Sequence, residues 1–381
     1  MPSTGRERAA AVRERAGVLR AWAGELGERA GALLVRRVRP WVRSRALVRR
    51  ALYDSHNAAG FSSLYEHEKM LADSTRVDTY QAAIARHVGP DDVVLDLGTG
   101  TGVLAMLAAR QGARRVYAID HAPIVEVAEA LARHNGIDTI TFEQVNSRSY
   151  TPPEKVDVIV HEQIGDSLFD ENMMVDNLLD LRRRALRPGG RILPARFELY
   201  VEPVALRSDR RVPFLWENRF HGLDFGIARH DEPPLARHRN PGHHYRWMLL
   251  DRSVAHFLTE PAPAVTFDLD TLPGSHHLPR VVEAARPVTR AGGLDGFCVY
   301  FRAIFDDEIS LTTSPLAPPT SWGTRIFRTP HTPCDAGDEL AWRVELTDLT
   351  NPGSWSVTSS ATPGRRTAGR AAAVPTGATA R

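Results

Sequence analysis

The chain has 381 residues, a length that favours two folded units and tails. Of these residues 43% are hydrophobic and 25% charged, a composition typical of a soluble globular protein. The formal net charge of +2 gives no overall field that would attract nucleic acid, so we expect no nucleic-acid partner. No run of about 18 apolar residues occurs, and arginines interrupt the apolar stretches near the N-terminus, which argues against a membrane span and a signal peptide. The two cysteines are too few for a disulfide framework or a metal site, and we expect a cytoplasmic protein.

Residues 1 to about 50 form a basic N-terminal extension. Its apolar positions between Val12 and Leu34 recur at helical spacing and predict an amphipathic helix. Such a helix packs on its own body, binds a partner or lies on an anionic membrane, and we favour the first. Lys69 and Lys155 are the only lysines, a bias toward arginine that is typical of GC-rich bacterial genomes.

Between about 51 and 194, short apolar runs alternate with helical segments. The predicted strands are 92–97, 116–119, 140–142 and 156–160, and the predicted helices include 103–110 and 124–134. This alternation favours a parallel, doubly wound α/β sheet.

From 195 to about 357 the helical periodicity fades, and apolar runs stand between Pro- and Gly-rich turns. The predicted strands are 200–204, 264–269, 297–305 and 339–346. We expect a β-rich second domain with a loop-rich insertion at about 207–260. Residues 358–381, rich in Thr, Ala, Gly, Pro and Arg, predict a disordered tail.

Three glycines, Gly98, Gly100 and Gly102, occupy alternate positions after the first predicted strand. Glycine lets the backbone approach a ligand closely and adopt positive φ. The spacing is G-x-G-x-G rather than the dinucleotide pattern G-x-G-x-x-G, and Asp96 before it suits an amino group better than a phosphate. Asp120, at the end of the next strand, is placed to bind both hydroxyls of a ribose.

Two carboxylates, Glu162 and Glu171, follow the fourth predicted strand, with Gly165 between them. Open α/β sheets bind ligands at the carboxyl ends of their strands, so this loop faces a reaction centre. A guanidinium is planar, permanently charged and rich in donors, and paired carboxylates match it. Because Asp166 and Asp170 lie in the same segment, an acidic surface loop is the alternative interpretation.

The glycine segment resembles motif I of class I S-adenosylmethionine methyltransferases, and residues 160–174 resemble the double-glutamate loop of protein arginine methyltransferases. The likeness runs from about 52 to 350. The other segments that carry it are His67–Asp73, Arg76–Tyr80, Pro194–Arg196, Trp216–Asn218, Gly222–Asp224, Thr313–Pro315 and Pro319–Trp322.

The resemblance implies a Rossmann-like domain that binds S-adenosylmethionine, followed by a β-barrel domain with an inserted dimerisation arm near Trp216 that builds a head-to-tail homodimer. Gly98, Gly100 and Gly102 would line the methionine and ribose portions of the cofactor, and Asp120 would hold the ribose.

In the family pattern Arg76 would pair with the carboxylate of the cofactor. Met70 and Met173 would line the methyl-transfer pocket, and Ser321 and Trp322 lie in the loop that carries the family's Thr-His-Trp motif.

The implied reaction is methyl transfer to a guanidinium nitrogen of arginine in proteins or peptides, with Glu162 and Glu171 as catalytic residues. A guanidino small molecule such as free arginine is the alternative acceptor. A non-catalytic scaffold that only binds the cofactor is a rival from another class.

Three positions depart from the family pattern. Ser321 replaces a histidine that pairs with the aspartate matching Asp73, and Asn146–Ser149 lacks the acidic residue that contacts the adenine amine. The aromatic motif at Leu52–His56 is displaced from His67 by a longer gap. Fold and cofactor survive these departures, but substrate identity and methylation type stay open.

The remaining candidates have plainer interpretations. We interpret His67 as a packed or surface histidine and expect Trp322 to pack against the wall of a substrate pocket. The pairs His243–His244 and His276–His277 have no partner acids at ligand spacing, so we expect no metal site.

Overall fold

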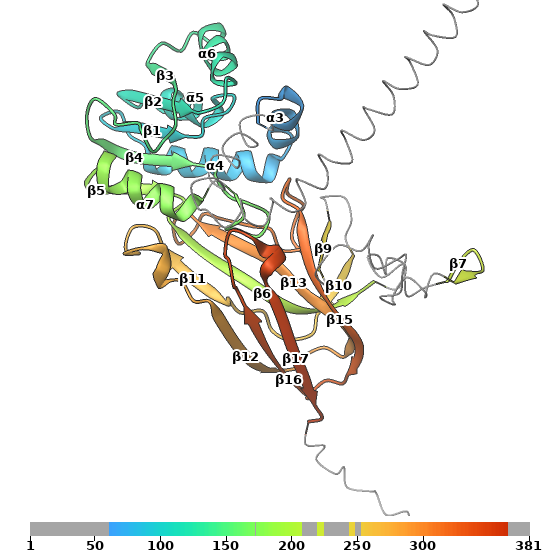
Figure 1. Cartoon of the computed structure of the whole chain (residues 1–381). Coiled ribbons are helices and arrows are strands. Elements are labelled where there is room, and N and C mark those ends of the chain that lie inside the picture. Colours follow the sequence, from blue (N-terminus) through green and yellow to red (C-terminus); the bar gives the residue numbers. More distant parts are fainter. Residues whose placement is uncertain (1–60, 172, 208–218, 225–243, 248–252, 365–381) are drawn as a thin grey trace, which may run out of the picture. The chain divides into compact units, whose positions relative to one another are not determined.

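The computed structural model describes residues 61–171, 173–207, 219–224, 244–247 and 253–364 (Figure 1). The expected N-terminal extension, the motif at Leu52–His56 and much of the expected arm, including Trp216, lie outside these residues.

A parallel sheet of five strands forms the first part of the described chain, in the order β3-β2-β1-β4-β5. Its strands are β1 (Val93–Leu97), β2 (Arg115–Asp120), β3 (Ile140–Gln144), β4 (Val156–His161) and β5 (Leu186–Leu193). Every residue of β1 and β4 is buried, as expected for central strands that are covered on both faces. The strand order reverses between β1 and β4, where doubly wound sheets open a ligand crevice at their carboxyl ends.

Helices alternate with these strands, as the sequence predicted (Figure 1). They are α3 (Leu64–Leu71), α4 (Ser74–His87), α5 (Val103–Arg110), α6 (Val125–His134) and α7 (Met174–Ala185). α5 packs against β1 and β2, α6 against β3 and α7 against β5, whereas α4 contacts α5 and the later strand β14.

The second part of the chain is antiparallel. A seven-stranded sheet contains β10-β6-β13-β15-β9 in that order, with β11 on β6 and β14 on β13, and a second sheet has the order β12-β16-β17. The bounds are β6 (Arg196–Leu206), β9 (His244–Trp247), β10 (Val254–Phe257), β11 (Val265–Asp268), β12 (Val281–Pro287), β13 (Gly292–Ile304), β14 (Ser310–Thr312), β15 (Thr324–Cys334), β16 (Glu339–Glu345) and β17 (Ser356–Thr362). A short hairpin joins β7 (Arg219–Phe220) to β8 (Leu223–Asp224).

Two boundaries differ from those suggested by the sequence. β9 and β10 lie within the stretch 207–260 but pair with β15 and β6, so part of the expected insertion belongs to the large sheet. β17 continues to Thr362, five residues into the segment expected to be disordered, because its small and β-branched residues pair with the whole of β16.

The core is continuous between the two parts. Phe169, from the loop after β4, stacks on Phe267 of β11 at a centroid distance of 5.5 Å. Phe267 in turn stacks on Phe197 of β6 at 5.2 Å. Offset aromatic stacks at these distances stabilise a core beyond their buried area. The loop that carries both glutamates is therefore packed onto the β domain.

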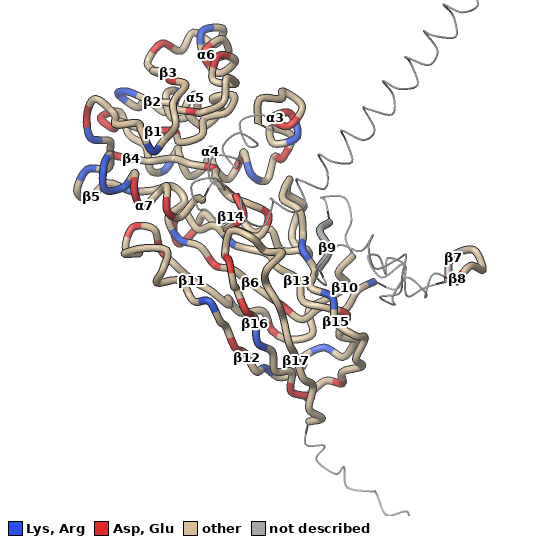
Figure 2. The backbone as a smooth tube through the Cα atoms, viewed as in Figure 1, with Lys and Arg blue, Asp and Glu red and all other residues tan. Residues whose placement is uncertain are grey.

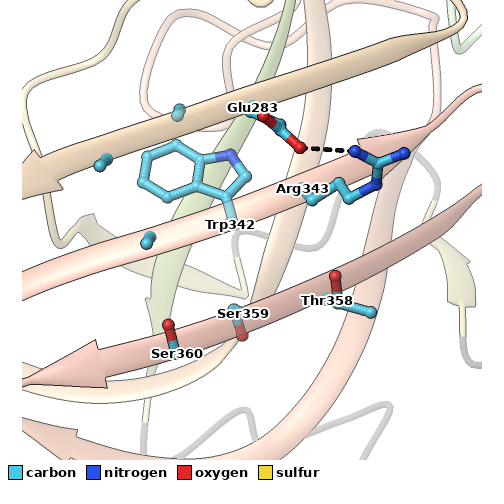
Figure 3. Close-up of a pocket in the computed structure, with 9 residues that line it drawn as sticks. Glu283, Trp342, Arg343, Thr358, Ser359 and Ser360 are labelled. Carbon is cyan, nitrogen blue, oxygen red and sulfur yellow. Dashed lines mark hydrogen bonds and ion pairs between the residues drawn. The ribbon is translucent and has the colours of Figure 1, made fainter.

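Two open hollows lie apart from the strand ends where the candidate site residues gather. One crosses the three-stranded sheet, where Figure 3 shows Trp342 beside the ion pair of Glu283 with Arg343. The other lies where α7 ends and β5 begins, a region rich in Lys and Arg in Figure 2. Its basic lining residues are Lys155, Arg182, Arg183 and Arg187.

Candidate active site

The carboxyl ends of β1, β2 and β4 bring the predicted site residues to one edge of the parallel sheet. The glycine loop follows β1, Asp120 ends β2 and Glu162 follows β4. The loops after β1 and β4 lie in contact: a Cβ added to Gly98 would lie 3.1 Å from Gln163 Nε2. The strand order therefore places the expected cofactor and substrate residues side by side.

All three glycines of the loop have positive φ, at +74° for Gly98, +54° for Gly100 and +80° for Gly102. Glycine adopts this region without the steric cost that other residues meet. A Cβ on Gly102 would lie 3.0 Å from the Cβ of Ala128 in α6. Gly102 thus also permits close packing of α6 against the start of α5, a role that the sequence interpretation did not include.

Asp96 is fully buried beneath the loop. Its Oδ2 accepts hydrogen bonds from Thr99 Oγ1 at 2.6 Å and from the Ala105 amide at 3.0 Å. Its Oδ1 is buried without a hydrogen-bond partner in the described part of the chain, and burial raises the pKa of the carboxyl to about 7. An unsatisfied buried acceptor is costly, so this oxygen suits a charged donor on a ligand.

Asp120 is held in one orientation by two backbone amides. Its Oδ2 accepts from the Gly100 amide at 3.0 Å, and its Oδ1 accepts from the Ala122 amide at 2.8 Å. Each carboxylate oxygen keeps a further lone pair for another donor. The glycine loop and the expected ribose-binding residue are therefore one hydrogen-bonded unit.

His67 lies against the glycine loop. Its side chain is buried, and its Nε2 is 2.9 Å from the carbonyl oxygen of Phe61. A Cβ on Gly100 would come within 2.6 Å of the His67 ring. The sequence indicated a packed or surface histidine, and the structure shows a packed one at the edge of the expected cofactor site.

Glu162 and Glu171 are brought into one largely buried environment. Burial raises the pKa of Glu162 to about 7, and the nearby Arg76 opposes that rise. Burial also raises the pKa of Glu171 to about 8, with the negative charges of Glu162 and Asp170 adding to it. The charge of Glu162 is therefore felt by Glu171, which is consistent with the arrangement that the double-glutamate resemblance implies.

Arg76 is the cation that faces this pair. Its Nη1 donates to Glu162 Oε2 at 3.2 Å, and its guanidinium lies 5.3 Å from the centroid of the Trp322 ring. Trp322 is itself buried and donates from Nε1 to the Ile164 carbonyl at 2.7 Å. Arg76, expected on the cofactor, is thus also a direct neighbour of a catalytic candidate.

The loop between the glutamates is tightly folded. A Cβ on Gly165 would meet Asp170 Oδ1 at 2.3 Å and the Glu171 amide nitrogen at 2.8 Å, so only glycine fits there. Asp166 accepts a hydrogen bond from the Gly323 amide at 2.7 Å. Contacts from the loop before β15 therefore fix a loop that follows β4.

Ser321 takes part through its backbone. Its amide donates to Asp73 Oδ2 at 2.6 Å, and Asp73 Oδ1 accepts from the Arg76 amide at 3.0 Å as the N-cap of α4. The family histidine expected at this position pairs with the same aspartate. Here a main-chain donor satisfies Asp73, so the contact between the loop and the helix does not need the imidazole.

Met70 and Met173 are both half-buried. Met70 lies in α3, and Met173, two residues beyond Glu171, caps α7 with a φ of +48°. No group of three or more His, Cys, Asp or Glu residues is placed to hold a metal ion in the described residues. No helix among these residues is long and apolar enough to cross a membrane.

Sequence reasoning missed two groups at this site. Tyr80 of α4, fully buried, donates from its hydroxyl to the His161 carbonyl at 2.8 Å, next to Glu162. Arg325 of β15 pairs with Asp170 beside Glu171. The long sequence separation between Asp170 and Arg325 leaves no local pattern that would have identified this pair.

Comparison of the sequence with known proteins identifies relatives of this chain. A family model described as a methyltransferase domain matches residues 89–214. Protein arginine N-methyltransferase 6 of Danio rerio is 30% identical over 288 residues, which cover 70% of this chain and 77% of that protein. Protein arginine N-methyltransferase PRMT10 of Oryza sativa subsp. japonica is 39% identical over 174 residues, 45% of this chain, but the match spans only 43% of that protein's length.

Solved structures show the same fold. The Trypanosoma brucei PRMT1 enzyme–prozyme heterotetrameric complex with AdoHcy matches with a TM-score of 0.63 and 27% identity, over 75% of this chain and 88% of that chain. Protein arginine methyltransferase 10 of Arabidopsis thaliana matches with a TM-score of 0.64 and 23% identity, over 80% and 99% respectively, which bears on the fold alone. The predicted fold class, a Rossmann-like domain followed by a β-barrel domain, is confirmed. The chain belongs to the protein arginine N-methyltransferase family.

Proposed function

We propose that this protein transfers a methyl group from S-adenosylmethionine to a guanidinium nitrogen of arginine in proteins or peptides. The observation that carries the proposal is the shared, largely buried environment of Glu162 and Glu171, in which the charge of one raises the pKa of the other. Two such carboxylates repel each other until a cation binds between them. A guanidinium, with its planar set of donors, relieves that repulsion and satisfies both groups.

The two glutamates orient the nucleophile. Hydrogen bonds from the guanidinium to the pair concentrate its positive charge toward the clamped nitrogens and leave the attacking nitrogen richer in electrons. The cofactor supplies an electrophilic methyl group on a sulfonium, and alignment with it accounts for most of the acceleration. The methylated nitrogen loses one proton, which a carboxylate oxygen of Glu162 or Glu171 accepts, a task suited to pKa values raised toward neutrality.

Six residues form the proposed cofactor site: Arg76, Asp96, Gly98, Gly100, Gly102 and Asp120. The unpartnered buried Oδ1 of Asp96 suits the ammonium group of a methionine moiety. Asp120, fixed by the Gly100 and Ala122 amides, suits a ribose. Arg76, bonded to Glu162, occupies the boundary between the cofactor and the acceptor.

The proposed acceptor pocket contains Met70, Met173, Ser321 and Trp322. Trp322 supports the pocket in two ways. The Arg76 guanidinium lies over its ring, and its Nε1 donates to the Ile164 carbonyl of the glutamate loop. The two methionines offer adaptable apolar walls for a methylated product. Ser321 contributes its backbone to Asp73.

We also propose a homodimer built through the inserted arm. Leu64 and Tyr65 of α3 are 61% and 66% exposed, and Leu223 at the β7–β8 hairpin is 63% exposed, which leaves apolar surface for a contact between copies. Sedimentation of the full chain at micromolar concentration should give twice 42.2 kDa. A monomer under those conditions would count against the dimer. The proposed compartment is the cytoplasm, where the buried free thiols Cys298 and Cys334 stay reduced.

The test of the function uses isotopically labelled S-adenosylmethionine with three acceptors: an arginine-rich peptide, a lysate of proteins and free arginine. Mass spectrometry should find label on arginine side chains of the peptide and proteins, and far less label after Glu162 and Glu171 are both changed to glutamine. Label on free arginine alone would replace the protein acceptor by a small guanidino metabolite. No transfer to any acceptor, with cofactor binding intact, would leave a cofactor-binding scaffold and overturn the proposal.

A further inference from the structure

Arg325 of β15 reaches from the β domain into the glutamate loop. Its side chain is only 10% exposed. Its Nε donates to Ser167 Oγ at 3.0 Å, and its Nη2 lies 3.5 Å from Asp170 Oδ2. One guanidinium therefore contacts two points of the loop, and the second point is the residue that immediately precedes Glu171.

Asp170 is held from three sides. Its Oδ1 accepts from the Ser167 amide at 2.8 Å and occupies the space that a Cβ on Gly165 would need. Its Oδ2 faces Arg325. These contacts orient the Asp170 side chain and, with it, the backbone that leads from Asp170 into Glu171.

The contact also balances charge. Burial raises the pKa of Asp170, whereas the Ser167 amide and Arg325 oppose that rise. The negative charge of Asp170 in turn raises the pKa of Glu171. Without Arg325, an uncompensated carboxylate would lie directly beside Glu171 in a poorly solvated site.

A buried ion pair of this kind is weak evidence for a role in stability. Burying two charges costs desolvation energy that their attraction often fails to offset, and apolar residues of similar size frequently replace such pairs without loss. A pair that connects the β domain to the residue next to a catalytic candidate has a more specific use.

We propose that Arg325 is a positioning residue, which fixes the Glu171 carboxylate for the acceptor guanidinium through Asp170 and Ser167. The inference rests on the proposed function, because it assigns Glu171 to the acceptor. It makes the β domain responsible for the geometry of one of the two glutamates.

Two variants test this role. Arg325→Met removes the charge and keeps the length, and Arg325→Lys keeps the charge but loses the planar guanidinium that contacts both Ser167 and Asp170. The matched control is Arg343→Met, which breaks an exposed ion pair with Glu283 on the three-stranded sheet (Figure 3). Thermal melting and cofactor affinity establish that each variant is folded. Arg325→Met should lower kcat roughly tenfold to a hundredfold with unchanged cofactor affinity, the scale expected when a reacting group is misplaced.

The pH profile separates positioning from general support. Arg325→Met should move the rising limb of kcat/KM to higher pH, because a carboxylate beside an uncompensated like charge holds its proton more tightly. Arg325→Lys should restore the limb and part of the rate, and Arg343→Met should match the wild type. Unchanged kinetics in Arg325→Met, or a lower rate with an unmoved limb, would overturn the inference.

A titration of Glu171 by carbon NMR of labelled glutamate keeps this test independent of turnover. Arg325→Met should raise the midpoint of the Glu171 carboxyl by about half a unit or more. An unmoved midpoint would refute the role of Arg325 even in an active enzyme. A moved midpoint in a protein that methylates no arginine would instead refute the proposed function and keep the link between Arg325 and Glu171.

Discussion

The glycine loop after β1 and the glutamate loop after β4 lie side by side but are held in different ways. Thr99 and Gly100 of the first loop bond to Asp96 and Asp120, and these two hydrogen bonds span 3 and 20 residues of sequence. The second loop bonds to Trp322, Gly323 and Arg325, with separations of 157 or 158 residues. The proposed cofactor half of the site is thus held mainly by local hydrogen bonds, whereas the proposed acceptor half depends on the β domain.

The two loops also differ in their electrostatics. Asp120 carries two amide donors on its carboxylate, one to each oxygen. Glu162 and Glu171 are raised in pKa by burial, and only Arg76 opposes both shifts as a cation. Asp120 is thus held by backbone donors before any ligand binds, whereas the glutamate pair gains most from a cation. Damage to one half should therefore leave the other half measurable.

The sharpest division comes from Glu162→Gln and Glu171→Gln. Each variant keeps its shape, so cofactor affinity by calorimetry should be unchanged while turnover falls by about tenfold to a few hundredfold, the value of a charge-assisted hydrogen bond of roughly 1.5–3 kcal/mol. Because the pair acts as one unit, the double variant should lose less than the product of the single losses. Near wild-type turnover in either single variant would show that this glutamate does not bind the acceptor guanidinium.

Gly165→Ala tests the glutamate loop through its backbone. The new methyl group would overlap Asp170 Oδ1 and the Glu171 amide, so the loop must shift, and a displacement of about 1 Å is worth up to roughly a hundredfold in rate. The control is Gly89→Ala, whose added Cβ would meet Asp92 Oδ2 at an ordinary 3.7 Å. Steady-state kinetics should show a lower kcat for Gly165→Ala, and cofactor titrations should show an unchanged cofactor affinity. Loss of cofactor affinity would mean that the two loops are not independent.

Asp120→Ala should have the opposite effect. Removing the carboxylate leaves two ribose hydroxyls and the Gly100 amide without an acceptor, a loss of about 1–3 kcal/mol in cofactor affinity. The pH dependence of turnover at saturating cofactor should stay as in the wild type, since the variant leaves the glutamate pair intact. If calorimetry finds the wild-type affinity, the ribose is held by other groups.

The smallest expected effect is the pH dependence of the wild type. Both glutamates have raised pKa values, of about 7 and about 8, so they carry protons below that range and cannot clamp a cation. Because each must lose its proton, kcat/KM should rise between pH 7 and 8 and level off above, with apparent values that belong to the pair. A flat profile from pH 6 to 9 would contradict the buried, coupled pair.

The sequence predicted what depends on local pattern. The glycine spacing, Asp120 at the end of β2, and the helix Val103–Arg110 follow from periodicity and turn chemistry, and all are present. What it could not predict depends on distant partners. The sequence of β10 indicates a loop, because only its pairing with β6 makes it a strand. Arg325 belongs to no recognisable sequence motif. Its role depends on Asp170, which only the folded structure brings beside it.

Helix α4 is fixed to the β domain at both ends. At its start the Ser321 amide bonds to Asp73, and at its end His87 Nε2 lies 2.7 Å from Asp306 Oδ2. A helix tethered at both termini cannot tilt without breaking one of these contacts. α3, which places His67 over the glycine loop and leaves Leu64 and Tyr65 in solvent, is the freer element. A rearrangement that uncovers the glycine loop would therefore fall to α3, which covers it through His67, and would leave the contacts of α4 with the β domain in place.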